Sequence, residues 1–176
     1  SKAKLTYTIY SGGVVDIDAA LSMPALRPGN KIEQIPFLRY ENYVRPRRIG
    51  MEFLLPPSMQ NIEWYGRGPN PTYIDREFER VGLFSGTVDE QWVDYSRPQE
   101  NGNKTGVRWV EITDGDGYGL KFSMLSAPLS LGARHYSQET MESSDYSFKM
   151  ERSSHVHLHI DHIQMGVGGV NSWKLG

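Results

Sequence analysis

A tryptophan near the C-terminus is the first candidate for chemistry in this sequence. Residues 165–176 read Met-Gly-Val-Gly-Gly-Val-Asn-Ser-Trp-Lys-Leu-Gly. Glycines permit positive φ values that other residues disfavour, so such a segment can direct an indole outward and away from a core. The apolar face of an indole can cover the C–H face of a pyranose while other groups hydrogen-bond its hydroxyls. Trp173 is therefore a candidate sugar-binding residue.

A second candidate is a row of three histidines and an aspartate at alternate positions. These residues are His155, His157, His159 and Asp161. Alternate residues share one face of a β-strand, so this row could hold zinc or copper. The intervening Val156, Leu158 and Ile160 form an apolar face, which is typical of an ordinary amphipathic strand. We therefore predict an outward polar face in preference to a metal site.

Other catalytic patterns are weak in this sequence. Residues 114–117 resemble the start of a calcium loop, but Leu125 stands where a bidentate glutamate is needed, so a hairpin turn is favoured. Residues 166–169 are too short for a phosphate-binding loop. Glycoside hydrolysis needs two carboxyl groups about 5 to 9 Å apart, and the sequence singles out no such pair. The sequence alone neither locates nor excludes a catalytic pair.

Two loop motifs could bind sugar hydroxyls or contact another domain. Residues 64–76 run through a Gly-Pro turn between aromatics, and residues 97–103 form a polar turn rich in amides. The candidate side chains in these loops are Arg67, Tyr73, Asp75, Arg76, Gln99, Glu100, Asn101 and Asn103. The favoured alternative is that Trp64 and Tyr65 are core and rim aromatics and that the amides satisfy loop backbone groups.

The elements that must position these residues are predicted to be short β-strands separated by glycine and proline. The expected strands are residues 5–10, 14–21, 31–40, 47–55, 61–65, 105–113, 119–124 and 155–161. One short helix is expected at residues 138–142, with Ser137 as its N-cap. Residues 66–97 lack sustained periodicity, so they are predicted to form a long functional or partner-facing loop.

Composition favours a single all-β domain and excludes some partners. Four Trp, ten Tyr and six Phe suit half-buried pleated surfaces. Nineteen Lys and Arg against 21 Asp and Glu leave no basic surface for nucleic acid. No apolar run is long enough to span a bilayer, so we predict no membrane partner. The chain has no cysteine, and the compartment stays open.

Taken together, three ordered motifs resemble the C-terminal domain of the large β-galactosidases of glycoside hydrolase family 2. The motifs are residues 64–76, residues 97–109 and residues 161–173. The resemblance covers roughly residues 1–176. It implies an antiparallel β-supersandwich related to aldose mutarotases, which agrees with the strand pattern. It also implies a domain excised from a larger enzyme and cut short at its C-terminus, where the family's domain continues for further strands.

The resemblance implies an accessory role in hydrolysis of terminal β-galactosides such as lactose. In the family the catalytic glutamates lie on a separate barrel, and magnesium and a monovalent cation bind to other domains. No catalytic residue and no cofactor are expected in this chain. The tryptophan of the Gly-Gly-Val-Asn-Ser-Trp motif contacts the sugar, and here it is Trp173, with Asn171 and Ser172 as neighbouring candidates. The expected partners are the other domains, especially the barrel, and the galactoside. An oligomeric parent enzyme is possible under this hypothesis.

Two other functions are open at this level. An autonomous carbohydrate-binding module would use Trp173 together with the turn at residues 99–103. A mutarotase-like epimerase would use a histidine as acid and a carboxylate as base, with His135 and the cluster at residues 155–162 as donors. Fold alone does not decide among these functions.

Overall fold

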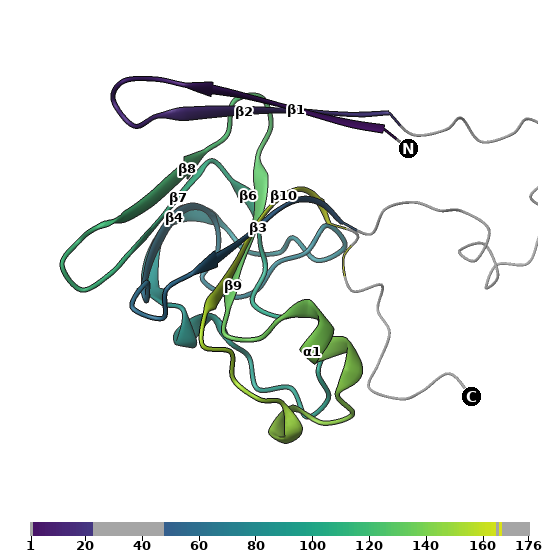
Figure 1. The fold of residues 1–176 in the computed structure, drawn as a ribbon. Coiled ribbons are helices and arrows are strands. Elements are labelled where there is room, and N and C mark those ends of the chain that lie inside the picture. The colour runs from purple at the N-terminus through teal and green to yellow at the C-terminus, as the bar shows by residue number, and fades with distance from the viewer. Residues whose placement is uncertain (1, 23–47, 165, 167–176) are drawn as a thin grey trace, which may run out of the picture. The chain divides into compact units, whose positions relative to one another are not determined.

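The computed structural model describes residues 2–22, 48–164 and 166 and divides the chain into two compact units (Figure 1). The units are residues 1–44 and 45–176. The strands are β1 (Lys2–Ile9), β2 (Val15–Ser22), β3 (Arg48–Leu55), β4 (Asn61–Arg67), β5 (Val81–Thr87), β6 (Lys104–Val107), β7 (Trp109–Thr113), β8 (Gly119–Ser123), β9 (Leu129–Arg134) and β10 (Val156–Gln164). The helical segments are η1 (Asp89–Gln91), α1 (Gln138–Ser143) and η2 (Ser147–Lys149).

The first unit contains the expected N-terminal hairpin. Strands β1 and β2 pair antiparallel, from Lys2 opposite Ser22 to Ile9 opposite Val15. Gly13 has a φ of 80° in the turn, which glycine adopts without strain. The predicted hairpin is therefore confirmed. The strand predicted at residues 31–40 lies outside the described residues.

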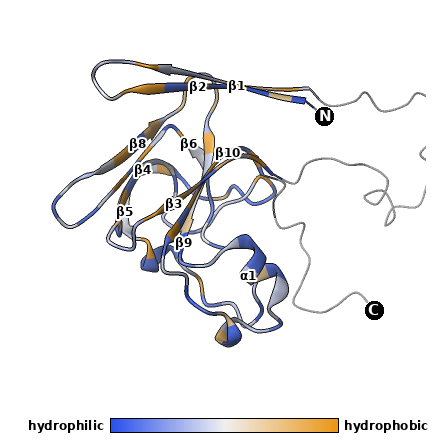
Figure 2. Cartoon of the chain, in the orientation of Figure 1, coloured by the Kyte–Doolittle hydropathy of each residue, from blue (hydrophilic) through white to orange (hydrophobic). Residues whose placement is uncertain are grey.

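In its described residues, the second unit contains two four-stranded antiparallel sheets. One sheet has the order β3-β10-β9-β6 and the other has the order β5-β4-β7-β8. Buried apolar side chains from both sheets form one cluster, which includes Leu131 and Leu158 from the first sheet and Trp64 and Ile112 from the second. Figure 2 shows the hydrophobic residues along strands of both sheets. The two sheets thus pack face to face in a sandwich-like arrangement, and the prediction of an all-β antiparallel fold is confirmed.

The prediction of a single strand at residues 105–113 was wrong, because the chain passes from one sheet to the other within this range. Strand β6 belongs to the first sheet and β7 to the second, and Arg108 alone separates them. Gly106 has a φ of 63°, and the β6–β9 register shifts between Lys104 and Val107. This left-handed residue bends the backbone, so an apparently continuous β pattern spans two strands.

Two strands were missed by the sequence prediction. Strand β5 lies inside the stretch that was expected to be a long loop, and β9 had not been expected. Helix α1 is confirmed, and the Oγ of Ser137 accepts a hydrogen bond from the Thr140 N–H, as an N-cap does. No helix in the described ranges is long and apolar enough to cross a membrane. The predicted single-domain supersandwich stays a prediction.

Gly50 should tolerate no side chain, because β3 and β10 approach each other closely there. A Cβ on Gly50 would lie 2.1 Å from Oδ1 of Asp161 and 2.5 Å from both the Asp161 Cα and the Ile160 carbonyl oxygen. We expect Gly50→Ala to lower the free energy of unfolding by about 2 kcal/mol, measured by urea denaturation. Gly115→Ala is the control, because nothing lies within 4 Å of that position. Equal stability of the two variants would contradict the expectation.

Candidate functional site

The polar face of β10 is buried, which corrects the prediction of an outward, solvent-exposed face. His157, His159 and Asp161 are 8%, 4% and 0% exposed, whereas His155 is exposed. The apolar face was predicted correctly at Val156 and Leu158, which lie in the core. Buried polar side chains need hydrogen-bond or ion-pair partners. The groups that supply these partners therefore define the candidate site.

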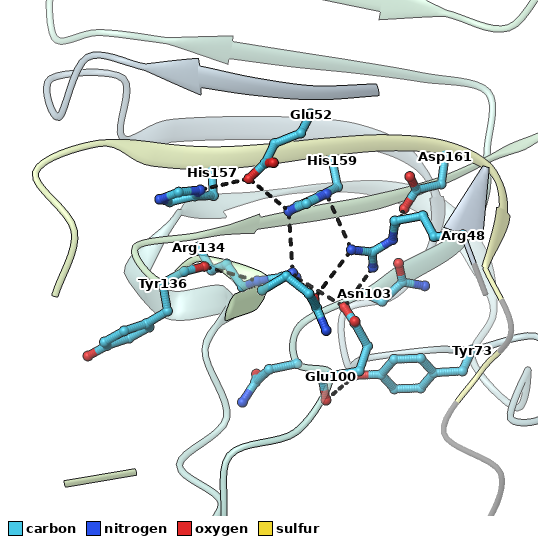
Figure 3. A network of polar contacts seen from close by, with 12 residues as sticks. Arg48, Glu52, Tyr73, Glu100, Asn103, Arg134, Tyr136, His157, His159 and Asp161 are labelled. Atoms are coloured by element: carbon cyan, nitrogen blue, oxygen red, sulfur yellow. Dashed lines mark hydrogen bonds and ion pairs between the residues drawn. The ribbon is translucent and has the colours of Figure 1, made fainter. Parts of the chain in front are cut away.

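Strand register brings together a set of charged and polar side chains that we call the buried cluster. Its members are Arg48, Glu52, Tyr73, Glu100, Arg134, Gln138, His157, His159 and Asp161. On β3, Glu52 stands opposite His159 and Gly50 stands opposite Asp161. On β9, Arg134 stands opposite His157 and Gly132 stands opposite His159. The two glycines carry no side chains, so they leave room over the sheet for the long side chains of their neighbours. Figure 3 shows Arg48 beside His159 and Asp161 in this space.

Glu100 connects the loop at residues 97–103 to this sheet. Its Oε1 lies 3.0 Å from Nη2 of Arg48 and 3.0 Å from Nη1 of Arg134. Its backbone carbonyl accepts a hydrogen bond of 3.1 Å from the hydroxyl of Tyr73 (Figure 3). One glutamate therefore ties two loops, around Tyr73 and around Glu100 itself, to strands β3 and β9.

Arg134 is the most deeply buried cation of the cluster. Its side chain is 1% exposed. Besides Glu100, it donates to Oε1 of Gln138 at 2.9 Å and to the Tyr136 carbonyl at 3.3 Å. Gln138 is the first residue of α1. Arg134 thus attaches the helix to the sheet, and a guanidinium suits this role because its planar fork serves several acceptors.

His159 is held neutral between two guanidinium groups. Its Nδ1 lies 3.3 Å from Nη1 of Arg48, and its Nε2 lies 3.3 Å from Nη2 of Arg134 and 3.5 Å from Oε1 of Glu52. Burial and then the two arginines lower its pKa to about 2. A neutral imidazole has one donor and one acceptor. Each ring nitrogen faces a guanidinium, so the neutral ring can accept a hydrogen bond from only one of Arg48 and Arg134.

Asp161 is the buried carboxyl group of the cluster. Its Oδ2 lies 2.9 Å from Nε of Arg48, while Oδ1 makes no hydrogen bond to protein. Burial raises its pKa to about 7 even though Arg48 opposes the shift. The contact with Arg48 is an ion pair without hydrogen-bond geometry, since neither Nε nor Oδ2 has a hydrogen-bond partner. Desolvation therefore dominates the protonation of this group.

The cluster is suited to positioning elements and not to exchanging protons with a substrate. Glu100, Asp161 and His159 face arginines, whereas His157 contacts Glu52. The members of the cluster come from β3, β9, β10, α1 and two loops. Among the described residues, no three His, Cys, Asp or Glu side chains are grouped to hold a metal ion. Sequence reasoning missed Arg48 and Arg134. The sequence signal for Arg48 was its alternation with Gly50 and Glu52, which is typical of residues that share one face of a strand.

Comparison with known proteins gives the family. The sequence model of the β-galactosidase small chain matches residues 1–176. The chain belongs to this family. The predicted resemblance is therefore confirmed.

Several β-galactosidases are similar to the chain over most of its length. That of Priestia megaterium is 36% identical over 171 residues, which are 97% of the chain and 15% of the relative. That of Bifidobacterium adolescentis is 31% identical over 175 residues, 98% of the chain and 15% of the relative. A Lactobacillus delbrueckii subsp. bulgaricus enzyme is 38% identical over 126 residues, 71% of the chain and 12% of the relative. The chain thus spans about 15% of the length of the first two relatives.

In this member of the small-chain family, two of the three predicted amides are used inside the fold. The side chain of Asn101 accepts from the Val93 N–H at 2.9 Å and donates to the Val93 carbonyl. That of Asn103 donates to the Thr72 carbonyl at 2.8 Å. Both asparagines are at most 2% exposed. These bonds match the favoured alternative that the amides satisfy loop backbone groups, as does the burial of Trp64 at 1% exposed.

The remaining predicted site residues lie in three places. Arg67 donates to the carbonyls of Glu77 and Glu79, and Asp75 and Arg76 are exposed in the same loop. Tyr73 and Glu100 belong to the buried cluster, and Gln99 is half-buried beside it in sequence. Trp173, Asn171 and Ser172 lie outside the described residues. A contact of any of these residues with sugar or with another domain stays a prediction.

Proposed function

We propose that this chain is the accessory domain of a β-galactosidase that hydrolyses terminal β-galactosides such as lactose. The supporting observation is the family match across all 176 residues together with the small share of each relative that the chain covers. About five sixths of such a relative lies elsewhere, and that portion has room for the catalytic acid and nucleophile. The chain itself contributes a wall of the sugar site.

The carboxyl groups of the buried cluster support an accessory role. Glu100 and Asp161 share Arg48, at 3.0 Å and 2.9 Å, and the Asp161 side chain is 1% exposed. A glycosidase needs one carboxyl group that protonates the leaving oxygen and one that attacks or activates water, and both must reach the sugar. Two carboxyl groups that are paired with the same half-buried guanidinium do not meet that need. The catalytic glutamates therefore belong to the other portion of the enzyme under this proposal.

Trp173 is the residue proposed to contact the sugar, with Asn171 and Ser172 beside it. An indole offers a flat apolar face to the C–H side of a galactose ring, and stacking of this kind contributes about 1 kcal/mol. The partners of this domain are then the catalytic portion of the enzyme and the galactoside. Magnesium and a monovalent cation are proposed to bind to that other portion, so this domain carries no cofactor.

The assembled enzyme tests the role of Trp173. We expect Trp173→Ala to raise KM for lactose about fivefold, because about 1 kcal/mol of contact energy corresponds to that factor. Tyr118→Ala is the matched control, since Tyr118 is an aromatic residue 75% exposed in a hairpin turn. Steady-state kinetics that do not distinguish Trp173→Ala from this control would refute the proposed sugar contact.

Calorimetry on the isolated chain separates the accessory domain from an autonomous carbohydrate-binding module. The module was expected to use the turn at residues 99–103, but the Asn101 and Asn103 amides already bind Val93 and Thr72. We therefore expect no heat of binding with galactose or lactose at millimolar concentration. Millimolar or tighter binding would favour the module.

A further inference from the structure

We propose that a cavity beside the passage from β6 to β7 binds a small organic anion that carries a carboxylate and hydroxyl groups. The cavity has a volume of about 320 Å³, which is within the range of small-molecule sites in proteins. It is lined by the ends of β4 and β10, the starts of β5 and β9, the passage itself and part of the loop before β5. Residues of the buried cluster do not line it, and the inference does not rest on the sugar contact of Trp173.

Two guanidinium groups give the cavity its charge. Arg67 and Arg108 both line it, and Glu77 is the one carboxylate among the described residues that do so. His162 also lines the cavity, and its imidazole can add only positive charge. The lining therefore has an excess of positive charge, which favours an anionic ligand over a neutral sugar.

The charge of Arg108 is not paired inside the described part of the chain. Its Nη1 donates to the Gly106 carbonyl, and its guanidinium carbon lies 5.8 Å from the centroid of the Tyr65 ring. No carboxylate of a described residue forms an ion pair with it. A guanidinium binds a carboxylate through two parallel N–H···O bonds, and one bond to a backbone carbonyl leaves N–H groups of Arg108 for this purpose.

Arg67 provides a second positive group close to the first. Its Nη1 donates to the carbonyls of Glu77 and Glu79 at 3.2 Å and 2.8 Å, which fixes the guanidinium in place. Its ion pair with the Glu77 carboxylate is long, at 3.7 Å, and partly exposed, so it neutralises Arg67 only weakly. Both arginines lie over Gly106, where a Cβ would meet Nη1 of Arg108 at 3.3 Å and Nε of Arg67 at 3.7 Å. An anion bound between them offsets their mutual repulsion.

Gln164 is the reason for placing hydroxyl groups on the ligand. It lines the cavity, it is 6% exposed, and its Oε1 is buried without a hydrogen bond to any described residue. Buried polar atoms without partners are unfavourable, and a side-chain amide can serve a hydroxyl as donor or as acceptor. Val81, Leu129 and Ile163 supply apolar wall for a carbon chain. A hydroxycarboxylate meets all three requirements of charge, hydrogen bonding and apolar contact.

An NMR titration of the 176-residue chain with gluconate tests the site. Glucitol is the matched ligand control, because it keeps the carbon chain and hydroxyls but lacks the carboxylate, and all titrations use one ionic strength. We expect saturable shifts of the Gly106, Arg108 and Ile163 amides with gluconate, with a Kd of about 1 mM and at least about tenfold weaker binding of glucitol. Equal affinity for the two compounds, equal affinity for inorganic phosphate, or no saturable shift would overturn the proposal.

Two variants test the assigned contacts. We expect Arg108→Gln to weaken gluconate binding about tenfold or more, because it removes the unpaired charge. Arg80→Gln is the control, since it removes the same charge from an exposed residue outside the lining. Equal weakening by both variants would mean general attraction to net charge and would overturn the site. Gln164→Leu should weaken gluconate binding and leave hexanoate binding unchanged, because hexanoate has no hydroxyl. Unchanged gluconate binding in Gln164→Leu would overturn the hydroxyl assignment. Parent-like amide spectra away from the cavity show that each variant is folded.

Calorimetry on the assembled enzyme distinguishes a free ligand from a carboxylate side chain of the rest of the enzyme. We expect gluconate to bind the assembled enzyme, and we expect Arg108→Gln to remove that binding. Binding to the 176-residue chain without binding to the assembled enzyme would overturn the free ligand and assign the cavity to a carboxylate of the other portion. Neither result depends on Trp173, so the proposed sugar contact stands or fails separately.

Discussion

Replacing Glu100 with alanine is expected to lower the free energy of unfolding of this chain by about 3 to 5 kcal/mol. Glu100 is the carboxylate shared by Arg48 and Arg134, at 3.0 Å from each. Without it, the Arg134 side chain, which is 1% exposed, keeps its charge but loses the one carboxylate it contacts in the described residues. An uncompensated buried charge is far more costly than the net value of the pair that it replaces.

Urea denaturation followed by tryptophan fluorescence measures this effect, because Trp64 lies in the core. Glu142→Ala is the control, since it removes an exposed carboxylate that accepts a hydrogen bond from Gln138. The additional change Arg134→Met should recover part of the loss, because it removes the stranded charge while keeping an apolar side chain. A loss below about 1 kcal/mol for Glu100→Ala would show that Arg134 finds another partner or water.

Opposing titrations in the buried cluster are the second large effect that we expect. The pKa of Asp161 is raised from 3.8 to about 7, so the folded chain binds more protons there than the unfolded chain. Stability from this group is present at low pH and falls as pH rises from about 4 to about 7. The pKa of His159 is lowered from 6.5 to about 2, so its contribution rises with pH across that range. Between about pH 4 and 6.5 the two slopes oppose each other.

Two variants should separate the slopes. Each titrating group contributes about 1.4 kcal/mol per pH unit inside its window. The stability of Asp161→Asn relative to the parent chain should therefore rise with pH between about 4 and 7. The stability of His159→Asn relative to the parent chain should fall as pH rises toward 6.5. Subtracting the free energy of unfolding of the parent chain removes the titration of groups that both chains share. The charged neighbours Arg48, Arg134, Glu52 and Glu100 then affect the difference only through their contacts with the altered side chain.

Unfolding free energies at pH 4.5, 5.5 and 6.5 are sufficient to check these slopes. The two difference curves should have opposite signs. Parallel curves for Asp161→Asn and the parent chain would mean that Asp161 titrates near its ordinary value in the fold. The same result for His159→Asn would mean that His159 accepts a proton in the folded chain near its unfolded pKa.

The class of fold could be predicted from local pattern, but two strands could not. The alternation at Val156 and Leu158 and the glycine turn after Tyr10 identified β10 and the first hairpin correctly. Strand β5 was missed because Gly82 and Gly86 interrupt its apolar residues and loop-like sequence precedes it. The change of sheet at Arg108 was missed. A β pattern in the sequence indicates an extended backbone with alternating side chains, and it does not indicate which sheet contains the neighbouring strand.

The buried cluster could be predicted only in part, because burial of a polar face depends on what covers it. The histidines and Asp161 were correctly placed on one face, yet that face was expected to meet solvent. Gln138 from α1 and Glu100 from a loop bring their side chains to the arginines from elsewhere in the sequence. Long-range contacts of this kind leave no periodic signal in the strand itself. The roles of the two asparagines were predicted correctly, because side-chain amides in loops commonly form hydrogen bonds with backbone groups.

The backbone that passes from β6 to β7 links the two sheets through a single residue. Only Arg108 joins the strands, and both its backbone groups are bonded: its N–H donates to the Tyr65 carbonyl at 2.8 Å, and its carbonyl accepts from the Met124 N–H at 2.9 Å. Both bonds fix Arg108 to the sheet of β4, β7 and β8, because Tyr65 lies on β4 and Met124 directly follows β8. The covalent chain through Arg108 is thus the direct link from this sheet to β6, and it leaves little length for the two sheets to separate at this point.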